Sequence, residues 1–203
     1  MKNNYKNNTG YTIIETMISV SLFIIIVMAG MGALLNANLL HGKSENMRSI
    51  MDSLSFIMED MSRNLRTGYN YHCFDDNDDV SANVSVPESG ENCWGISFEH
   101  QGGTLYDDPP TNINYHDEDQ WVYYINGEKI YKSTDGGGTV IQLTPDEVII
   151  ELSDGFSVLG AEPSPGDSQQ PFVTIKLVGK IIMKGVETPF SLQTSVSQRG
   201  LDI

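Results

Sequence analysis

The chain has 203 residues and is strongly acidic, with 12 Lys and Arg against 27 Asp and Glu and a net charge of −15. Such a surface argues against binding nucleic acid through its phosphates, which requires clustered basic residues. The length allows one soluble domain of roughly 130–160 residues beside an N-terminal apolar segment.

The first ten residues are polar and carry two lysines, Lys2 and Lys6. The segment Gly10-Tyr11-Thr12-Ile13-Ile14-Glu15 follows, and residues 16–42 contain no Asp, Glu, Lys or Arg. About twenty apolar residues span the hydrocarbon core of a bilayer as a helix, because a helix satisfies its backbone hydrogen bonds internally. Since cytoplasmic flanks favour Lys and Arg, the lysine side is expected inside and the acidic body outside.

This region resembles the processing site of type IV pilins and type II secretion pseudopilins. It has a short polar leader, a glycine, an aromatic residue directly after it, an acid at the fifth position after the glycine, and a retained apolar run. The resemblance implies cleavage after Gly10 by a prepilin peptidase and N-methylation of Tyr11, where the family most often has Phe. An ordinary signal peptide cut near Ala33 or Ala37 is the alternative. The expected divisions are a leader at 1–10, a transmembrane and filament-core helix at 11–40, and a pilin-like domain at 41–203.

An acid placed in hydrocarbon costs on the order of 3 kcal/mol and normally finds a partner. The resemblance implies that Glu15 pairs with the N-terminal amine of a neighbouring subunit and so sets the axial register of assembly. The alternative is that its carboxylate reaches the headgroup region.

Beyond residue 42 the pattern becomes amphipathic, with apolar residues every three or four positions, which predicts one buried stripe of a helix that continues to about residue 67. The stripe comprises Met47, Ile50, Met51, Leu54, Ile57, Met58, Met61 and Leu65. Gly68 is expected to cap this helix, and Gly30, Gly32, Asn36 and Asn38 to bend or locally melt it at residues 30–38.

The remainder reads as short strands without a βαβ rhythm, which predicts an α+β domain with a mainly antiparallel sheet packed on the helix. An Asn-Gly pair at 126–127 predicts a two-residue hairpin turn between 121–125 and 128–132. The other expected strands are 94–99, 139–143, 147–152, 171–178, 181–184 and 190–198, with a turn at 135–138 and loops at 69–92, 102–119 and 160–170.

The two cysteines, Cys73 and Cys93, fall in the outer part, where disulfides persist. A bond between them is expected to stabilise the domain by roughly 3 kcal/mol, and two free thiols are the alternative. Zinc binding by His72, Cys73, Cys93 and His100 is disfavoured because their spacing matches no paired zinc motif.

Calcium is considered because Asp75, Asn77 and Asp79 start like an EF-hand loop, but Val80 and Val86 occupy the positions of its Gly and Glu. A looser calcium site with Asp107, Asp108 or the acidic run 117–119 stays open. No cofactor is otherwise expected. No common catalytic or nucleotide-binding motif occurs, so an enzyme is disfavoured.

The body resembles the larger minor pseudopilins, the J-type in particular, at residues 124–127, 130–133 and 197–199. We therefore expect a structural minor pilin or pseudopilin in a tip or initiation complex, held in the inner membrane by one span. The implied partners are other pilins or pseudopilins, the prepilin peptidase and the assembly platform, with no nucleic acid. A tip-displayed binding module for a secretion substrate or surface, and a membrane-tethered enzyme, are the alternatives.

Overall fold

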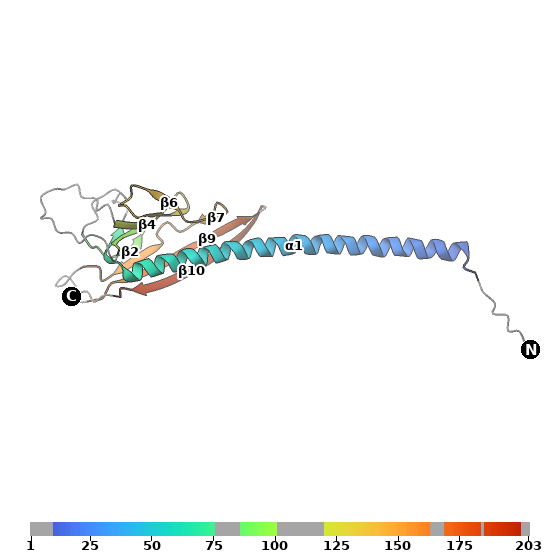
Figure 1. Ribbon diagram of the computed structural model, residues 1–203, viewed down its shortest axis with the longest axis horizontal. Coiled ribbons are helices and arrows are strands. Elements are labelled where there is room, and N and C mark those ends of the chain that lie inside the picture. Colours follow the sequence, from blue (N-terminus) through green and yellow to red (C-terminus); the bar gives the residue numbers. More distant parts are fainter. Residues whose placement is uncertain (1–9, 76–85, 101–119, 163–168, 184, 200–203) are drawn as a thin grey trace, which may run out of the picture. The chain divides into compact units, whose positions relative to one another are not determined.

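The computed structural model describes residues 10–75, 86–100, 120–162, 169–183 and 185–199 (Figure 1). The chain divides into two compact units, Met1–Arg48 and Ser49–Ile203. The helix α1 (Ile13–Thr67) contributes to both. This layout of one long N-terminal helix and antiparallel sheets is the α+β class that the sequence predicts.

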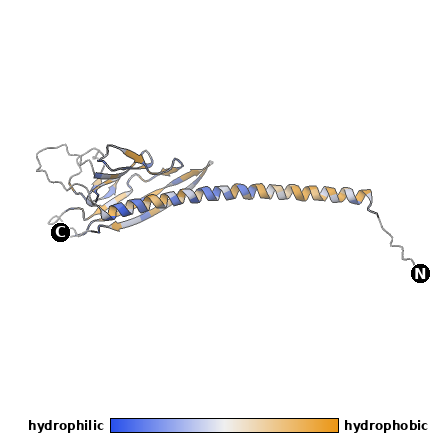
Figure 2. Cartoon of the chain, in the orientation of Figure 1, coloured by the Kyte–Doolittle hydropathy of each residue, from blue (hydrophilic) through white to orange (hydrophobic). Residues whose placement is uncertain are grey.

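Within the first unit, α1 runs through residues 30–38 without interruption, so the prediction of local melting there is wrong. A side-chain carbon added at Gly30 or Gly32 would meet nothing within 4 Å, so neither glycine is required by packing. Each glycine costs about 1 kcal/mol relative to Ala, and the Leu, Met and Ala residues around them favour the helix. Figure 2 shows that apolar residues dominate the N-terminal part of α1.

Within the second unit, the end of α1 buries the predicted stripe. Its buried residues are Ile50, Leu54, Ile57, Met58, Met61 and Leu65, while Met47 and Met51 are half-buried. The amphipathic period therefore identified the packing face correctly. Because these positions return to one side every three or four residues, the opposite face stays exposed.

The C-terminal end of α1 is closed by a tyrosine rather than by a left-handed glycine. The Tyr71 hydroxyl lies 2.5 Å from the Leu65 carbonyl oxygen and 2.7 Å from that of Gly68, and can donate to either. Helix ends leave carbonyl groups without intrahelical partners, which Tyr71 supplies here. Gly68 is needed for space, since an added side-chain carbon would collide with the Phe98 ring.

The described residues of the second unit also form two antiparallel sheets. The first has the order β1-β3-β4-β5-β6 and the second the order β10-β9-β8-β2, with β7 also pairing β9. The strands are β1 (Tyr69–Phe74), β2 (Gly90–Cys93), β3 (Gly95–Glu99), β4 (Gln120–Asn126), β5 (Lys129–Ser133), β6 (Val140–Gln142), β7 (Val148–Ile150), β8 (Phe156–Leu159), β9 (Phe172–Met183) and β10 (Val186–Ser197).

The region predicted as a loop at 69–92 contains two strands, so this prediction is wrong for β1 and β2. A register shift between Tyr69 and His72, with Asn70 at φ +54°, disrupts the alternation that would have revealed β1. Residues 76–85 of this expected loop lie outside the described residues, as do the expected loop at 102–119 and residues 163–168 of the loop expected at 160–170.

The predicted hairpin forms between β4 and β5, but its turn is shifted by one residue. Asn126 pairs with Lys129, so the central residues are Gly127 and Glu128, at φ +53° and +67°. Two positive φ values fit a type I′ turn. This register places Ile125 opposite Ile130, and that apolar pair offsets the strain of Glu128.

Strands at the C-terminal end are longer than expected. One strand, β9, replaces the two strands expected at 171–178 and 181–184. Gly179 continues the pairing with β10 and pairs with β7 on its other side. An added side-chain carbon at Gly179 would collide with the Ile149 backbone. The short strand β8 was not predicted, whereas the strands at 94–99, 139–143, 147–152 and 190–198 are confirmed in type as β3, β6, β7 and β10.

Two polar groups connect the end of α1 with the first sheet inside the core. The buried Tyr123 hydroxyl accepts a hydrogen bond from Asn64 at 2.8 Å and donates to Asp60 at 3.2 Å. Burial raises the pKa of Tyr123 well above 10, and burial likewise raises the pKa of Tyr71. Both hydroxyls therefore favour the neutral form in the folded protein.

We predict that the protein loses stability above pH about 10. The unfolded chain releases these two protons near its ordinary pKa while the folded chain keeps them, so unfolding is favoured as pH rises. Each group contributes a slope of about 1.4 kcal/mol per pH unit in the free energy of unfolding. Urea unfolding between pH 8 and about pH 11 measures the slope. Tyr71→Phe and Tyr123→Phe should each reduce it, and an unchanged slope in both variants would contradict the assignment.

Candidate functional site

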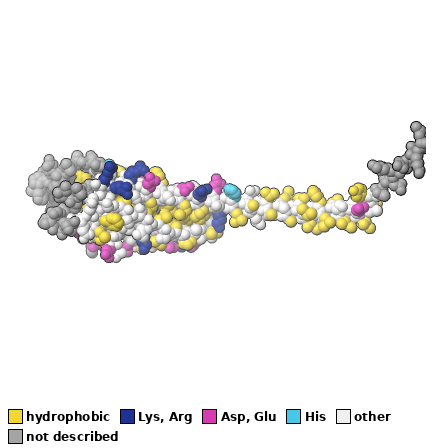
Figure 3. Space-filling view, turned by 90° about the horizontal axis from the view of Figure 1, so that it is seen from below, with side chains coloured by type: hydrophobic (Ala, Val, Ile, Leu, Met, Phe, Trp, Pro, Cys, Tyr) yellow, Lys and Arg dark blue, Asp and Glu magenta, His cyan; other side chains and the backbone are white. Residues whose placement is uncertain are grey.

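The N-terminal unit presents an apolar surface that no other described residue covers. Every residue from 10 to 42 is exposed, including Phe23 at 67% and Met28 at 71%. Figure 3 shows apolar side chains along this part of α1 on the visible face. By length and composition the helix is able to cross a membrane. So much apolar surface requires hydrocarbon or other helices around it.

The start of this helix lies where the sequence resemblance puts the processing site. Gly10, Tyr11 and Thr12 precede α1 and are exposed. The Thr12 hydroxyl accepts a hydrogen bond from the Glu15 backbone N–H at 3.4 Å. This is the N-cap interaction of a Thr-x-x-Glu sequence, and an acid in the first turn also interacts favourably with the helix dipole.

Hydroxyl groups in the apolar helix are satisfied within it. Thr16, Ser19 and Ser21 each donate to a backbone carbonyl three or four residues earlier, at 2.8 Å. These side chains therefore place no unpaired donor in hydrocarbon. Glu15 differs from them, because it is the only Asp, Glu, Lys, Arg or His between residues 12 and 40.

The Cys73–Cys93 disulfide is present, as the sequence analysis favoured. It joins β1 to the end of β2 with Cα atoms 5.4 Å apart, and both cysteines are buried. Packing around it is close, since a side-chain carbon added at Gly90 would collide with the Cys73 sulfur. The bonded sulfurs are not thiolates, so the set His72, Cys73, Cys93 and His100 offers no cysteine ligand to zinc.

Metal ligands do not gather elsewhere in the described ranges, which contain no group of three or more His, Cys, Asp or Glu arranged to hold an ion. The candidate calcium residues Asp107, Asp108 and 117–119 lie outside the described residues. Asn77 and Asp79 lie outside them as well. Asp75 is described, and its carbonyl oxygen accepts a hydrogen bond from the Trp94 indole at 2.5 Å.

A second polar cluster joins α1 to the first sheet near its surface. Lys132 on β5 donates to Asp60 at 3.1 Å, and its ammonium lies 4.3 Å from the centre of the Trp121 ring. His100 stacks on the same ring at 4.3 Å. Only 16% of the Lys132 side chain is exposed, so its charge is paired twice, by a carboxylate and by an aromatic face. This cluster holds the helix on the sheet.

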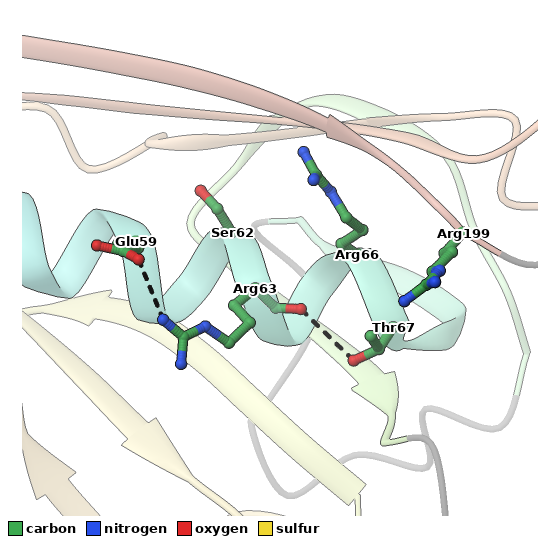
Figure 4. Close-up of a pocket in the computed structure, with 6 residues that line it drawn as sticks. All are labelled: Glu59, Ser62, Arg63, Arg66, Thr67 and Arg199. Carbon is green, nitrogen blue, oxygen red and sulfur yellow. Dashed lines mark hydrogen bonds and ion pairs between the residues drawn. The ribbon is translucent and has the colours of Figure 1, made fainter.

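An arginine-lined pocket of about 350 Å³ lies at the end of α1 (Figure 4). Its described lining comprises Glu59, Ser62, Arg63, Arg66, Thr67 and Arg199. Arg199 is brought there by β10, and its backbone N–H donates to the Arg66 carbonyl at 2.8 Å. In Figure 4 the Arg63 side chain reaches back to Glu59, 3.0 Å away.

The amphipathic pattern placed the end of the helix near residue 67, but it did not reveal the pocket. Arg199 follows the last strand, and only the pairing of β10 returns it to the helix end. No local pattern in the sequence signals this approach. The residues predicted for processing and assembly are far in the sequence from both this pocket and the disulfide. Gly10 and Tyr11 directly precede α1, and Glu15 lies in its first turn.

Comparisons with family profiles, characterised proteins and solved structures give no significant match. The class is therefore defined by the architecture. The chain has one long apolar N-terminal helix, able to cross a membrane, which continues into an α+β domain with antiparallel sheets. This is a pilin-like architecture.

We predict that removing the disulfide lowers the free energy of unfolding by about 3 kcal/mol, because the bond closes a loop across a sequence separation of 20 residues in the unfolded chain. The measurement is urea unfolding of the full chain and of Cys73→Ala/Cys93→Ala. Dithiothreitol should destabilise the parent protein by a similar amount and leave the variant unchanged. Equal stability of the two proteins would show that the bond has no such role.

Proposed function

We propose that the chain is a structural minor pilin or pseudopilin, a subunit of a type IV pilus or a type II secretion pseudopilus. The observation that carries the proposal is the order of features at the start of α1. Gly10 and Tyr11 are exposed and outside the helix, Glu15 lies in its first turn, and an uncovered apolar helix follows. The pilin-like architecture supports it.

Cleavage after Gly10 is supported by the accessibility of that bond. A peptidase must bind its substrate in an extended form, and residues 10–12 precede the helix. The new amine at Tyr11 would lie immediately before the Thr12 cap, where it becomes the substrate for N-methylation. Prepilin peptidase is thus the first partner in this proposal.

Assembly follows from the need to cover the apolar helix. Before assembly the helix lies in the inner membrane, with Lys2 and Lys6 on the cytoplasmic side and the acidic domain outside. Extraction into a filament replaces lipid by the helices of other pilins or pseudopilins on the assembly platform. Glu15 then pairs with the N-terminal amine of a neighbour, which removes the cost of an isolated carboxylate in an apolar environment.

The minor role, in a tip or initiation complex, rests on the body. A two-sheet domain of this size with a disulfide resembles the larger minor subunits more than a short, regular major subunit. A subunit at a tip also exposes its domain to secretion substrates or surfaces. The arginine-lined pocket is the feature of this chain that favours such a binding role as the second candidate.

The first test is the N-terminal residue of the mature protein. We predict a single chain that begins at Tyr11 with a monomethylated amine, because cleavage after Gly10 exposes that residue. Intact mass and N-terminal peptide mass spectrometry of the membrane fraction measure it. A chain that begins at Met1 or near residue 38 would remove the proposed class.

The second test concerns Glu15. We predict that Glu15→Ala is cleaved normally at Gly10 but assembles about tenfold less, since the loss of about 1.4 kcal/mol per contact changes an equilibrium by that factor. The measurement is the fraction of the subunit in sheared filaments or cross-linked multimers. Ser19→Ala, one turn further along the same helix, is the control and should assemble normally. Normal assembly of the Glu15 variant would contradict the pairing.

A further inference from the structure

The arginine-lined pocket at the end of α1 is positive on a strongly negative protein. Three of the four arginines in the entire chain line it, namely Arg63, Arg66 and Arg199. Glu59 is the single carboxylate among its described lining residues, and it pairs with Arg63. The lining therefore carries a net charge of about +2, while the chain as a whole carries −15.

The two remaining guanidinium groups are available to a ligand. Arg66 and Arg199 are exposed, and among the residues that the structure describes neither guanidinium forms a hydrogen bond or an ion pair. The backbone hydrogen bond from Arg199 to Arg66 keeps the two residues together. A guanidinium presents a planar fork of donors that matches a carboxylate with two parallel hydrogen bonds.

An exposed aromatic side chain extends this surface along α1. Phe56 is 71% exposed although it lies within the helix that forms the core. With 3.6 residues per turn, Phe56, Glu59, Arg63 and Arg66 fall within an arc of about 80°, opposite the buried stripe. Phe56 lies roughly 10 Å from Arg63 along the helix axis, at 1.5 Å per residue. We call Phe56, Arg63, Arg66 and Arg199 the Phe–Arg surface.

We propose that the Phe–Arg surface binds a carboxylate-bearing segment of another subunit, with an apolar side chain on Phe56 and carboxylates on Arg66 and Arg199. Aromatic and arginine side chains are the residues most enriched at the centres of protein interfaces. This inference rests on the proposed function, because it names a subunit contact within that assembly.

The charge of the surface favours a carboxylate-bearing segment over a second copy of this surface or a nucleic acid. A symmetric contact between two copies would bring the same positive surface against itself, and this repulsion disfavours a twofold dimer. Nucleic acid is disfavoured because its many phosphates would meet the negative charge of the rest of the chain. A peptide with few carboxylates and an apolar residue fits both the pocket and Phe56.

The test uses the full-length protein in a neutral detergent and a fluorescent probe peptide. The probe is an amidated helical peptide with two glutamates one turn apart and a leucine two turns away, and its matched control replaces both glutamates by glutamine. Fluorescence anisotropy measures the dissociation constant. We expect the glutamate peptide to bind at least about tenfold more tightly than the glutamine peptide, as charge-assisted hydrogen bonds require.

The variants separate this surface from general charge. Arg66→Gln/Arg199→Gln should weaken binding of the glutamate peptide about tenfold, whereas Lys43→Gln/Lys176→Gln, which removes the same charge outside the pocket, should change it less than about twofold. Phe56→Ser should weaken binding of the leucine peptide but not of a version with serine at that place. All these positions are at least partly exposed, so the variants are expected to fold.

Equal weakening by both double variants, equal binding of the two peptides, or tighter binding of an oligonucleotide or of anionic vesicles than of the peptide would overturn the proposal. The assay requires no filament assembly. A methylated Tyr11 together with no peptide binding would therefore reject this surface and leave the proposed function standing. Selective peptide binding by a protein that starts at Met1 would reject the proposed function and leave the binding surface standing.

Discussion

The structure depends on one constraint, which is that the same helix must satisfy two different surroundings. Through residue 42 every side chain of α1 is exposed and most are apolar, so this part requires hydrocarbon or other helices. From Ile50 onward the helix buries only one stripe and leaves its other face to water. The change from an all-round to a one-sided apolar pattern determines where the first unit ends and the domain begins.

The domain holds this second part of the helix by several independent devices. Apolar contacts of the stripe provide most of the burial, while Tyr71 caps the final carbonyls and Tyr123 joins the helix to the first sheet. Lys132, Asp60 and Trp121 add a charged and aromatic contact at the edge. The disulfide then ties β1, which follows the helix directly, to β2. A helix held in this way can present its free face as a rigid surface.

Electrostatics divide the molecule into regions with different consequences. The net charge of −15 opposes contact with polyanions. Against this background, the pocket with Arg63, Arg66 and Arg199 is a local reversal of sign. Glu15 is a single negative charge within an apolar part of the sequence, whereas the pocket is a positive site on an acidic chain. In the proposed assembly, the pocket and Glu15 both contact other subunits. At each site the neighbouring subunit supplies the opposite charge that the surrounding residues of this chain do not.

Patterns local in the sequence determined much of this protein. The apolar run predicts the candidate span, the three-and-four spacing predicts the buried face of α1, and the Asn-Gly pair predicts the hairpin, because periodicity and turn chemistry act between near neighbours. The distance between Cys73 and Cys93 is not a local property, and the disulfide could be favoured but not established until β1 and β2 were placed.

Tertiary structure alone decided the rest. The Gly127-Glu128 turn was chosen by the pairing of Ile125 with Ile130, and the continuity of β9 by its pairing with β10 across Gly179. Arg199 reaches the end of α1 only because β10 returns the chain there, 133 positions after Arg66 in the numbering. Such contacts depend on which distant strands pair, and strand pairing depends on the packing of the entire domain rather than on any short stretch of sequence.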